Sequence, residues 1–169
     1  LTRLVGSEMC IRDRLQIEKC HILGKGYVGM VVLAKNNNKI VALKIRRIDS
    51  PRKNMLNEAK LLQIVNKLGI GPKFIKNSKN FLVMEYIDGE KIIDWAKKTE
   101  TKSQEVRSVL NNVLRECYLL DDAGLDHGEL STIDKHVIVG KNKNTIIDFE
   151  SSSTNLSLIH ISEPTRRVR

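Results

Sequence analysis

The order of the predicted elements assigns this chain to the α+β class. The first half reads as three strands, a helix and a further strand, whereas the second half reads as helices, a loop and a hairpin. Runs of strands followed by runs of helices are typical of α+β proteins. The order therefore predicts a strand-rich lobe followed by a helical lobe, joined near residues 85–90.

The strands of the first half have distinct sequence patterns. Residues 16–23 alternate weakly, residues 30–34 are apolar and β-branched, and residues 40–45 (IVALKI) form a third strand. The polar stretch 36–39 (NNNK) predicts the turn between the second and third strands. A further strand of the buried type is expected over residues 80–87, with Asp88 and Gly89 at its end.

One helix is predicted between the third and fourth strands. Ser50 is the expected N-cap, Pro51 the expected first helical residue, and Gly69 the expected stop. The apolar stripe of this helix consists of Met55, Ala59, Leu61, Leu62 and Val65.

The second half is predicted to be mainly helical. A short helix is expected around residues 92–96, and a long helix over 103–123 that ends at Gly124. Residues 127–134 (HGELSTID) read as a loop, and two short strands follow over 136–140 and 144–148. The expected buried face of the long helix consists of Val106, Leu110, Val113, Leu114, Cys117 and Leu120.

The two ends of the chain resemble translated sequencing adapter. Codons for Met9–Asp13 can be chosen whose reverse complement encodes residues 156–161 (LSLIHI), so both ends look like one transposase adapter read from opposite directions. We therefore expect residues 1–14 and 156–169 to be fusion scars, and the remaining insert to lack its native start and end.

Charge and cysteine content restrict the class of protein only loosely. The net charge is +9, and it becomes +6 without the ends, because these hold six of the 29 basic and three of the 20 acidic residues. That balance suits nucleic acid or acidic partners, and solubility explains it equally well. Outside the ends, Cys20 and Cys117 show neither metal-ligand spacing nor a disulfide framework, which favours a reducing cytoplasm. No apolar run is long enough to span a membrane.

Residues 24–31 (GKGYVGMV) fit the pattern G-x-G-x-x-G-x-V between two predicted strands. A dinucleotide-binding fingerprint would open a helix, so a glycine-rich flap over phosphates fits better. A tight glycine-rich hairpin without a ligand is the alternative for this stretch alone. Lys44 then lies within the apolar strand VALK, where an unpaired ammonium would be costly, and Glu58 on the next helix is its candidate partner. A solvated lysine and a surface glutamate are the alternatives for this pair.

Several motifs in this order resemble those of protein-kinase-like phosphotransferases. They are the glycine loop, VALK, Glu58, residues 84–86 (MEY), HGEL and IDFE (147–150). The chain is most similar to compact archaeal predicted serine/threonine kinases, which are relatives of the RIO kinases and of the small kinase of the tRNA threonylcarbamoylation complex. The resemblance spans residues 23–153 and implies a two-lobe kinase fold that is truncated at its C-terminus. It implies an N-lobe over 15–87 and a partial C-lobe over 88–155.

The resemblance also implies roles for individual residues. Met84 would be the gatekeeper, the main chain of Glu85 and Ile87 would bind adenine, and Asp148 would bind Mg²⁺ with help from Asp134, for which His136 is a rival. The implied nucleotide site comprises Gly24, Gly26, Gly29, Val31, Ala42, Lys44, Glu58, Met84, Glu85 and Ile87.

Glu129 stands where kinases have the catalytic aspartate. Glutamate keeps the carboxylate but adds one methylene, which shifts the oxygens by about 1 Å and can cost about a hundredfold in rate. A working base at Glu129 is one alternative, and a weakened or lost base is the other. His127 is expected to brace the site, and Glu150 replaces the usual glycine of the metal-binding segment.

The resemblance implies ATP and Mg²⁺ as cofactors. The expected reaction is transfer of the γ-phosphate to a serine or threonine hydroxyl, either on a protein substrate or on the chain itself. A small-molecule kinase of the choline or aminoglycoside type is one alternative, because these kinases share the IDFE string. A nucleotide-binding pseudokinase scaffold, acting in an RNA-linked complex, is the other.

Overall fold

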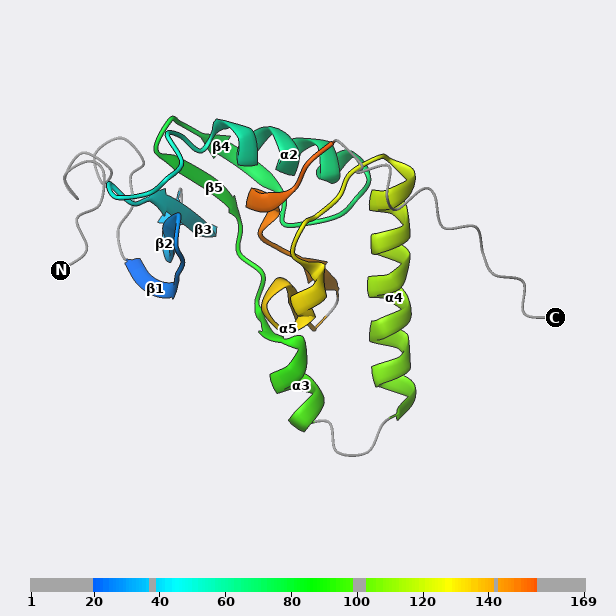
Figure 1. The fold of residues 1–169 in the computed structure, drawn as a ribbon. Helices are drawn as coiled ribbons and strands as arrows, with labels where there is room; N and C mark the ends of the chain where they lie inside the picture. Colours follow the sequence, from blue (N-terminus) through cyan, green and yellow to red (C-terminus); the bar gives the residue numbers. More distant parts are fainter. Residues whose placement is uncertain (1–19, 37–38, 99–102, 142, 155–169) are drawn as a thin grey trace.

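The computed structural model describes residues 20–36, 39–98, 103–141 and 143–154. Outside these residues lie the two expected adapter segments, residues 16–19 of the first expected strand and the two central residues of the expected NNNK turn. The described residues form an α+β fold with an antiparallel sheet and one helix first, and a smaller sheet with three helices second (Figure 1). The predicted fold class is confirmed.

The first part is a five-stranded antiparallel sheet with the strand order β1-β2-β3-β5-β4. Its strands are β1 (Cys20–Lys25), β2 (Gly29–Asn36), β3 (Lys39–Arg46), β4 (Phe74–Asn77) and β5 (Phe81–Glu85). Sequence analysis did not predict β4, because its four residues, FIKN, are too few to show a period. The strand expected over 80–87 is shorter than predicted, and the chain leaves the sheet after Glu85.

The predicted start of the first helix is wrong. Helix α2 (Leu56–Lys67) begins six residues after Ser50, and Met55 is its N-cap. The Ser50 hydroxyl instead accepts a hydrogen bond from the Arg52 N–H at 3.2 Å, which forms a local turn that competes with a helix. The expected apolar stripe is buried, and Gly69 follows the helix with a φ of 76°, as expected for a C-terminal stop.

The second part contains the small antiparallel sheet β6-β7-β8 and the helices around it. Its elements are β6 (Gly89–Lys91), α3 (Ile92–Lys98), α4 (Ser103–Asp122), α5 (Ile133–His136), β7 (Val137–Gly140) and β8 (Asn144–Ile146). Gly89 does not end the sheet structure as expected. It opens β6 and pairs with Gly140, where a Cβ atom would lie 2.5 Å from the Val139 carbonyl oxygen.

The loop predicted over 127–134 is partly helical. A 3-10 turn covers Leu130–Thr132, and α5 follows from Ile133. The predicted buried face of α4 is also partly wrong, since Leu110 and Leu114 are exposed. The residues of α4 that are buried are Val109, Val113 and Leu120, so the buried stripe is narrower than predicted and begins at a different residue.

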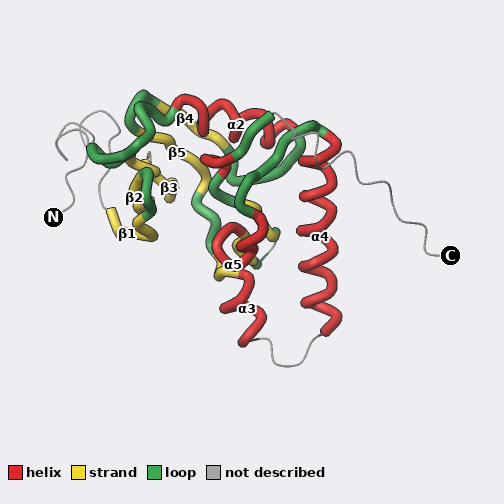
Figure 2. The backbone as a smooth tube through the Cα atoms, in the orientation of Figure 1, coloured by secondary structure: helices red, strands yellow, loops and turns green. Residues whose placement is uncertain are grey.

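One continuous apolar core joins the two parts. It includes Leu62 of α2, Leu82 of β5, Val113 of α4 and Phe149. The chain passes from the first part to the second in a single crossing after β5 (Figure 2). In the described residues, no helix combines the length and hydropathy needed to cross a bilayer. The two parts therefore meet over a shared core, and the polar site described next lies at this junction.

Candidate active site

Strand register gathers several predicted site residues on one face of the five-stranded sheet. Lys44 of β3 pairs with Val31 of β2, and Val31 pairs in turn with Gly24 of β1. Ala42 lies two residues before Lys44 and pairs with Met84 of β5. Residues directly opposite each other, and residues two apart along a strand, point to the same face. The sheet therefore presents these five residues to one side.

The glycine loop between β1 and β2 closes through a hydrogen bond from the Gly26 N–H to the Gly29 carbonyl at 2.8 Å. Val28 is buried and fixes the loop to the core. A Cβ atom on Gly29 would lie 2.7 Å from the Ile45 carbonyl oxygen, whereas one on Gly24 would meet nothing within 4 Å. The fold itself thus requires glycine at 29, while Gly24 leaves open space beside the sheet.

Lys44 makes three ion pairs. Its Nζ lies 2.9 Å from Glu58 Oε1, 2.8 Å from Asp148 Oδ1 and 2.7 Å from Glu150 Oε2. An ammonium group has three N–H donors, so each carboxylate accepts one of them. The contact expected between Lys44 and Glu58 is present, and it lies between the sheet and α2. Lys44 therefore connects the sheet, α2 and the segment after β8.

Burial and charge act in opposite directions on this cluster. Burial by itself lowers the pKa of Lys44, but Glu58, Asp148 and Glu150 together raise that pKa well above its ordinary value. Burial raises the pKa of Glu58, with Lys44 opposing it. Burial would likewise raise the pKa of Asp148, yet the Lys44 ammonium holds it below its ordinary value. Lys44 and Asp148 are therefore charged at neutral pH.

Asp148 follows β8 in a left-handed backbone conformation, with φ 69° and ψ 68°. It is the only non-glycine residue with positive φ in the part of the chain that the structure describes. Such strain concentrates at functional sites, where the surrounding structure enforces it. The turn places Asp148 and Glu150 on the same side of the segment, and both reach Lys44.

His127 lies in the core of the site. Because the Ile147 carbonyl can only accept, His127 Nε2 carries the hydrogen of their 3.1 Å bond. The ring also packs edge-on against Phe149 and His136, with ring centroids 5.0 and 5.4 Å away. Burial lowers the pKa of His127, so the ring is neutral at pH 7. This side chain holds the HGEL segment against the Asp148 turn.

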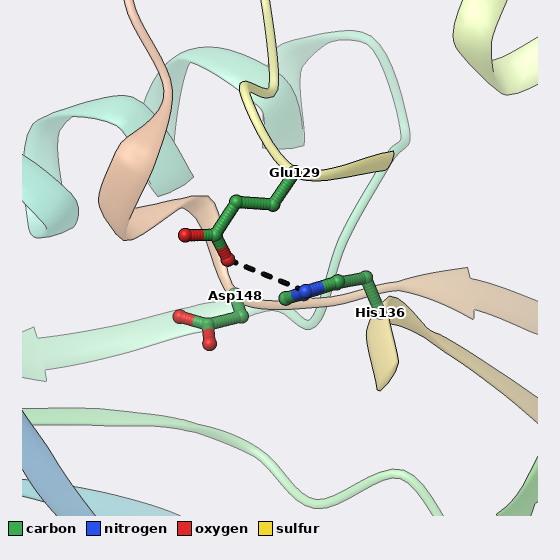
Figure 3. A group of neighbouring side chains, drawn as sticks. All are labelled: Glu129, His136 and Asp148. Atoms are coloured by element: carbon green, nitrogen blue, oxygen red, sulfur yellow. Dashed lines mark ion pairs between the residues drawn. The ribbon is translucent and has the colours of Figure 1, made fainter. Parts of the chain in front are cut away.

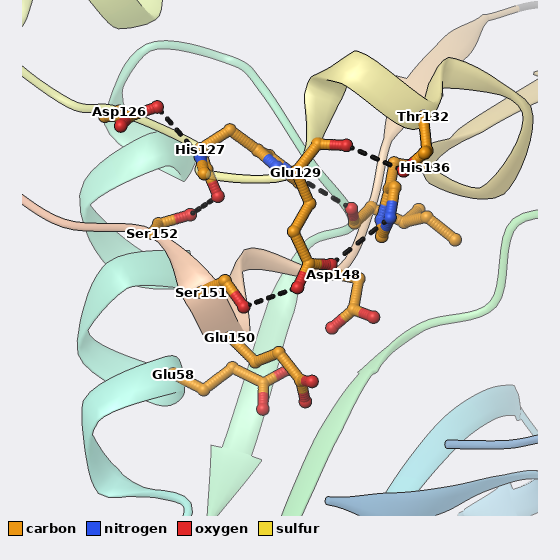
Figure 4. A network of polar contacts seen from close by, with 12 residues as sticks. Glu58, Asp126, His127, Glu129, Thr132, His136, Asp148, Glu150, Ser151 and Ser152 are labelled. Carbon is orange, nitrogen blue, oxygen red and sulfur yellow. Dashed lines mark hydrogen bonds and ion pairs between the residues drawn. The ribbon is translucent and has the colours of Figure 1, made fainter. Parts of the chain in front are cut away.

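Both oxygens of the Glu129 carboxylate are engaged (Figures 3 and 4). Oε1 accepts a hydrogen bond from the Ser151 hydroxyl at 2.6 Å, and Oε2 lies 3.3 Å from His136 Nε2. Contacts on both oxygens fix the longer side chain of glutamate in one place. The extra methylene therefore does not leave this carboxylate loosely positioned.

Two groups of described residues have the composition of a metal site, and Asp148 belongs to both. Oxygen and nitrogen atoms of Glu129, His136 and Asp148 lie within 4.8 Å of one another, and so do oxygens of Glu58, Asp148 and Glu150. Glu58 Oε2 is buried without a hydrogen-bond partner. Carboxylate oxygens are the ligands that Mg²⁺ prefers, so the group of Glu58, Asp148 and Glu150 fits the ion. Asp134 is exposed on α5 and belongs to neither group.

The segment expected to bind adenine lies at the end of β5. Met84 is half-buried against the core, and Glu85 is exposed. The Glu85 N–H donates to the Lys73 carbonyl at 2.8 Å, and the Glu85 carboxylate accepts from the Lys73 N–H at 3.1 Å. These bonds fix the main chain of Glu85 beside Ala42 and Met84.

Sequence reasoning missed two contacts of the site, those of Glu150 with Lys44 and of Ser151 with Glu129. The available signal was a pair of acids two residues apart, directly after a predicted strand. A strand would send such residues to the same face, but only the left-handed turn at Asp148 decides what they contact.

Comparison with known proteins identifies the family. A family model described as the RIO domain matches residues 33–157. No curated protein matches the chain. The matched region contains Lys44, Glu58, Glu129 and Asp148, and it covers most of the 169 residues. The chain therefore belongs to the RIO domain family, an atypical protein-kinase-like family of ATP-binding phosphotransferases.

Proposed function

We propose that the chain transfers the γ-phosphate of ATP, with Mg²⁺, to a serine or threonine hydroxyl. The observation that supports this best is the arrangement of Lys44, Asp148 and Glu129. The Lys44 ammonium, which can hold phosphates, lies 2.8 Å from the Asp148 carboxylate, which can hold a metal. The Glu129 carboxylate has an oxygen within 4.8 Å of Asp148. Phosphoryl transfer depends mainly on such positioning and charge stabilisation.

The nucleotide would lie on the sheet face that carries Lys44. Gly24, Gly26 and Gly29 cover the phosphates, Val31 and Ala42 face the base, and the main chain of Glu85 and Ile87 beside Met84 binds adenine. Lys44 has all three of its N–H groups on carboxylates. Phosphate oxygens would therefore take the places of Asp148 and Glu150 on Lys44, while Glu58 continues to hold it.

Asp148 is the proposed principal ligand of Mg²⁺, since it belongs to both groups of residues that could hold a metal ion. Asp148 would hold the ion, whose charge would neutralise negative charge on the phosphates. Release of Asp148 and Glu150 from Lys44 would free their oxygens for this purpose. The proposal that Asp134 is a second ligand rests on its sequence position alone.

Glu129 is the proposed base. Its carboxylate would accept the proton of the attacking hydroxyl, which requires a distance of about 2.6–3.2 Å between the two oxygens. Neutral His127 holds the segment that carries Glu129, and His136 holds Oε2 of the carboxylate. The acceptor is a protein or the chain itself. The net charge of +9 is compatible with an RNA-linked complex, and the cysteine content suits the cytoplasm.

The test is transfer of label from γ-labelled ATP by the purified chain, beside Asp148→Asn and Asp134→Asn. We expect Mg²⁺-dependent label on protein, abolished by Asp148→Asn. Tight Mg²⁺-dependent ATP binding without transfer to protein or to small hydroxyl compounds would identify a scaffold instead. Transfer to a small hydroxyl compound but not to protein would identify a small-molecule kinase. Full transfer by Asp134→Asn would remove Asp134 from the proposed metal ligands.

A further inference from the structure

We propose that Ser151 is a phosphate acceptor of this site, so that the chain phosphorylates itself in cis. This inference rests on the proposed function and names the hydroxyl on which it acts. The Ser151 Oγ lies 2.6 Å from Glu129 Oε1, and the hydroxyl is the donor in this hydrogen bond (Figure 4). A hydroxyl bound to a catalytic carboxylate at this distance has the geometry that general-base catalysis requires.

The chain holds Ser151 in this place by contacts on both sides. Asp126 and Ser153 form a two-bond antiparallel bridge, with both N–H···O distances at 2.9 Å. The Ser152 hydroxyl donates to the His127 carbonyl at 3.3 Å. The segment after Asp148 is thus paired residue by residue with the segment before Glu129, and this pairing brings the Ser151 hydroxyl to the carboxylate.

Gly128 makes the close approach possible. Its φ is 81°, and a Cβ atom at this position would lie 2.7 Å from the Ser151 carbonyl oxygen. Glycine is the residue that adopts this backbone conformation without strain and leaves that space. The glycine of HGEL is therefore needed for contact between the two segments.

The Ser151 hydroxyl is also close to the proposed phosphate site. The Glu129 carboxylate, which the Ser151 hydroxyl contacts, has an oxygen within 4.8 Å of Asp148. Asp148 is the proposed metal ligand and stands three residues before Ser151. A γ-phosphate held at Asp148 would therefore lie next to the group that takes the hydroxyl proton. The side chain of the neighbouring Ser152 points elsewhere, because it donates to a carbonyl.

The proposed step balances without a further reactant. The Ser151 Oγ forms a bond to the γ-phosphorus of ATP, and the bond from that phosphorus to the β–γ bridging oxygen breaks. ADP leaves with this bond's electron pair, and the hydroxyl proton passes to Glu129. The products are ADP and a phosphoserine at 151.

The test uses the full chain of 169 residues with Mg²⁺ and γ-labelled ATP, followed by proteolysis and mass spectrometry of the labelled peptide. Ser151→Ala removes the hydroxyl, Ser151→Thr retains one, and Ser153→Ala serves as the control from the same segment. A generic protein acceptor is assayed in parallel. Circular dichroism checks that each variant is folded.

We expect phosphate on Ser151 at a rate per chain that is independent of protein concentration. Ser151→Ala should lose this label, Ser151→Thr should carry it on threonine, and Ser153→Ala should retain it on Ser151. Label that lies only at other positions of the wild type, and that Ser151→Ala leaves unchanged, would overturn the proposal, as would a rate per chain that rises with concentration. Transfer to the generic acceptor with Ser151 unmodified would overturn it while leaving the kinase function intact. Absence of all phosphate transfer would instead contradict both the Ser151 proposal and the proposed kinase function.

Discussion

At the scale of single residues, Asp148 combines a functional group with a strained backbone. Its φ of 69° is one that asparagine and aspartate tolerate better than other non-glycine residues. Asp148→Asn therefore removes the charge while keeping a side chain suited to this backbone. This makes it a cleaner probe of the carboxylate than alanine, which would add strain of about 1–2 kcal/mol.

The pH dependence of stability should report the ionisation of Asp148. The pKa of Asp148 is lower in the folded chain than in the unfolded chain. Ionised Asp148 therefore stabilises the fold fully above its unfolded pKa of about 3.9. This stabilisation is lost as the pH falls through the lower pKa of the folded chain. We expect the difference in free energy of unfolding between the wild type and Asp148→Asn to be largest near pH 7. It should shrink below about pH 3.9. Urea titrations at a series of pH values measure it, and a difference that does not change with pH would contradict this account.

Lys44 should matter more for stability than any surface lysine. Lys44→Met leaves three carboxylates without their shared cation, and breaking a buried ion pair costs about 3–5 kcal/mol. Lys98→Met is the matched control, because the ion pair between Lys98 and Glu90 is exposed and should contribute less than about 1 kcal/mol. Denaturant unfolding of both variants gives the comparison. Equal losses would show that the Lys44 cluster is no more important than an exposed pair.

At the scale of elements, sequence predicted those with a clear pattern, including the short strands β7 and β8, and missed β4 and β6. Strands β2 and β3 and helix α4 were predicted near their observed positions, because each has enough residues to show a pattern. Strands β4 and β6 have four and three residues, and only their partners in the sheet define them. The start of α2 was misplaced because Ser50 and Pro51 form a turn that carries the same signal as a helix N-terminus.

The candidate site shows the same division. The contact between Lys44 and Glu58 could be predicted, since a charged residue in an apolar strand needs a partner on the next element. The contacts of Glu150 and Ser151 could not be predicted, because they depend on one left-handed residue and on the pairing of two loop segments. Asp134 was chosen by sequence position, and α5 leaves it exposed.

The glycine loop gives a prediction at this scale. Gly29→Ala would place a Cβ atom 2.7 Å from the Ile45 carbonyl oxygen, so we expect overpacking to cost about 1–3 kcal/mol. Gly24→Ala meets nothing within 4 Å in the protein and should change the free energy of unfolding by less than about 0.5 kcal/mol. It should nevertheless weaken ATP binding if the phosphates approach this glycine. Thermal unfolding and ATP titration of both variants distinguish the two effects.

At the scale of the whole molecule, the sheet part and the helical part share one core and meet again at Lys44. We therefore expect a single cooperative unfolding transition rather than two. A ligand that binds the folded chain stabilises it by about 2.7 kcal/mol at a concentration 100 times its Kd. MgATP should raise the midpoint of this single transition. ATP without Mg²⁺ should do so less, and two separate transitions with only one responding to MgATP would contradict the shared core.

The most direct test of the central claim is the rate of phosphate transfer by Glu129→Gln beside the wild type, with ATP affinity measured on the same samples. Glutamine keeps the size of the side chain but removes its capacity to accept a proton. We predict a rate at least about a hundredfold lower with ATP affinity unchanged, as expected for loss of a general base. Equal transfer rates in the two proteins would show that Glu129 is not the base and would contradict the assignment of this site.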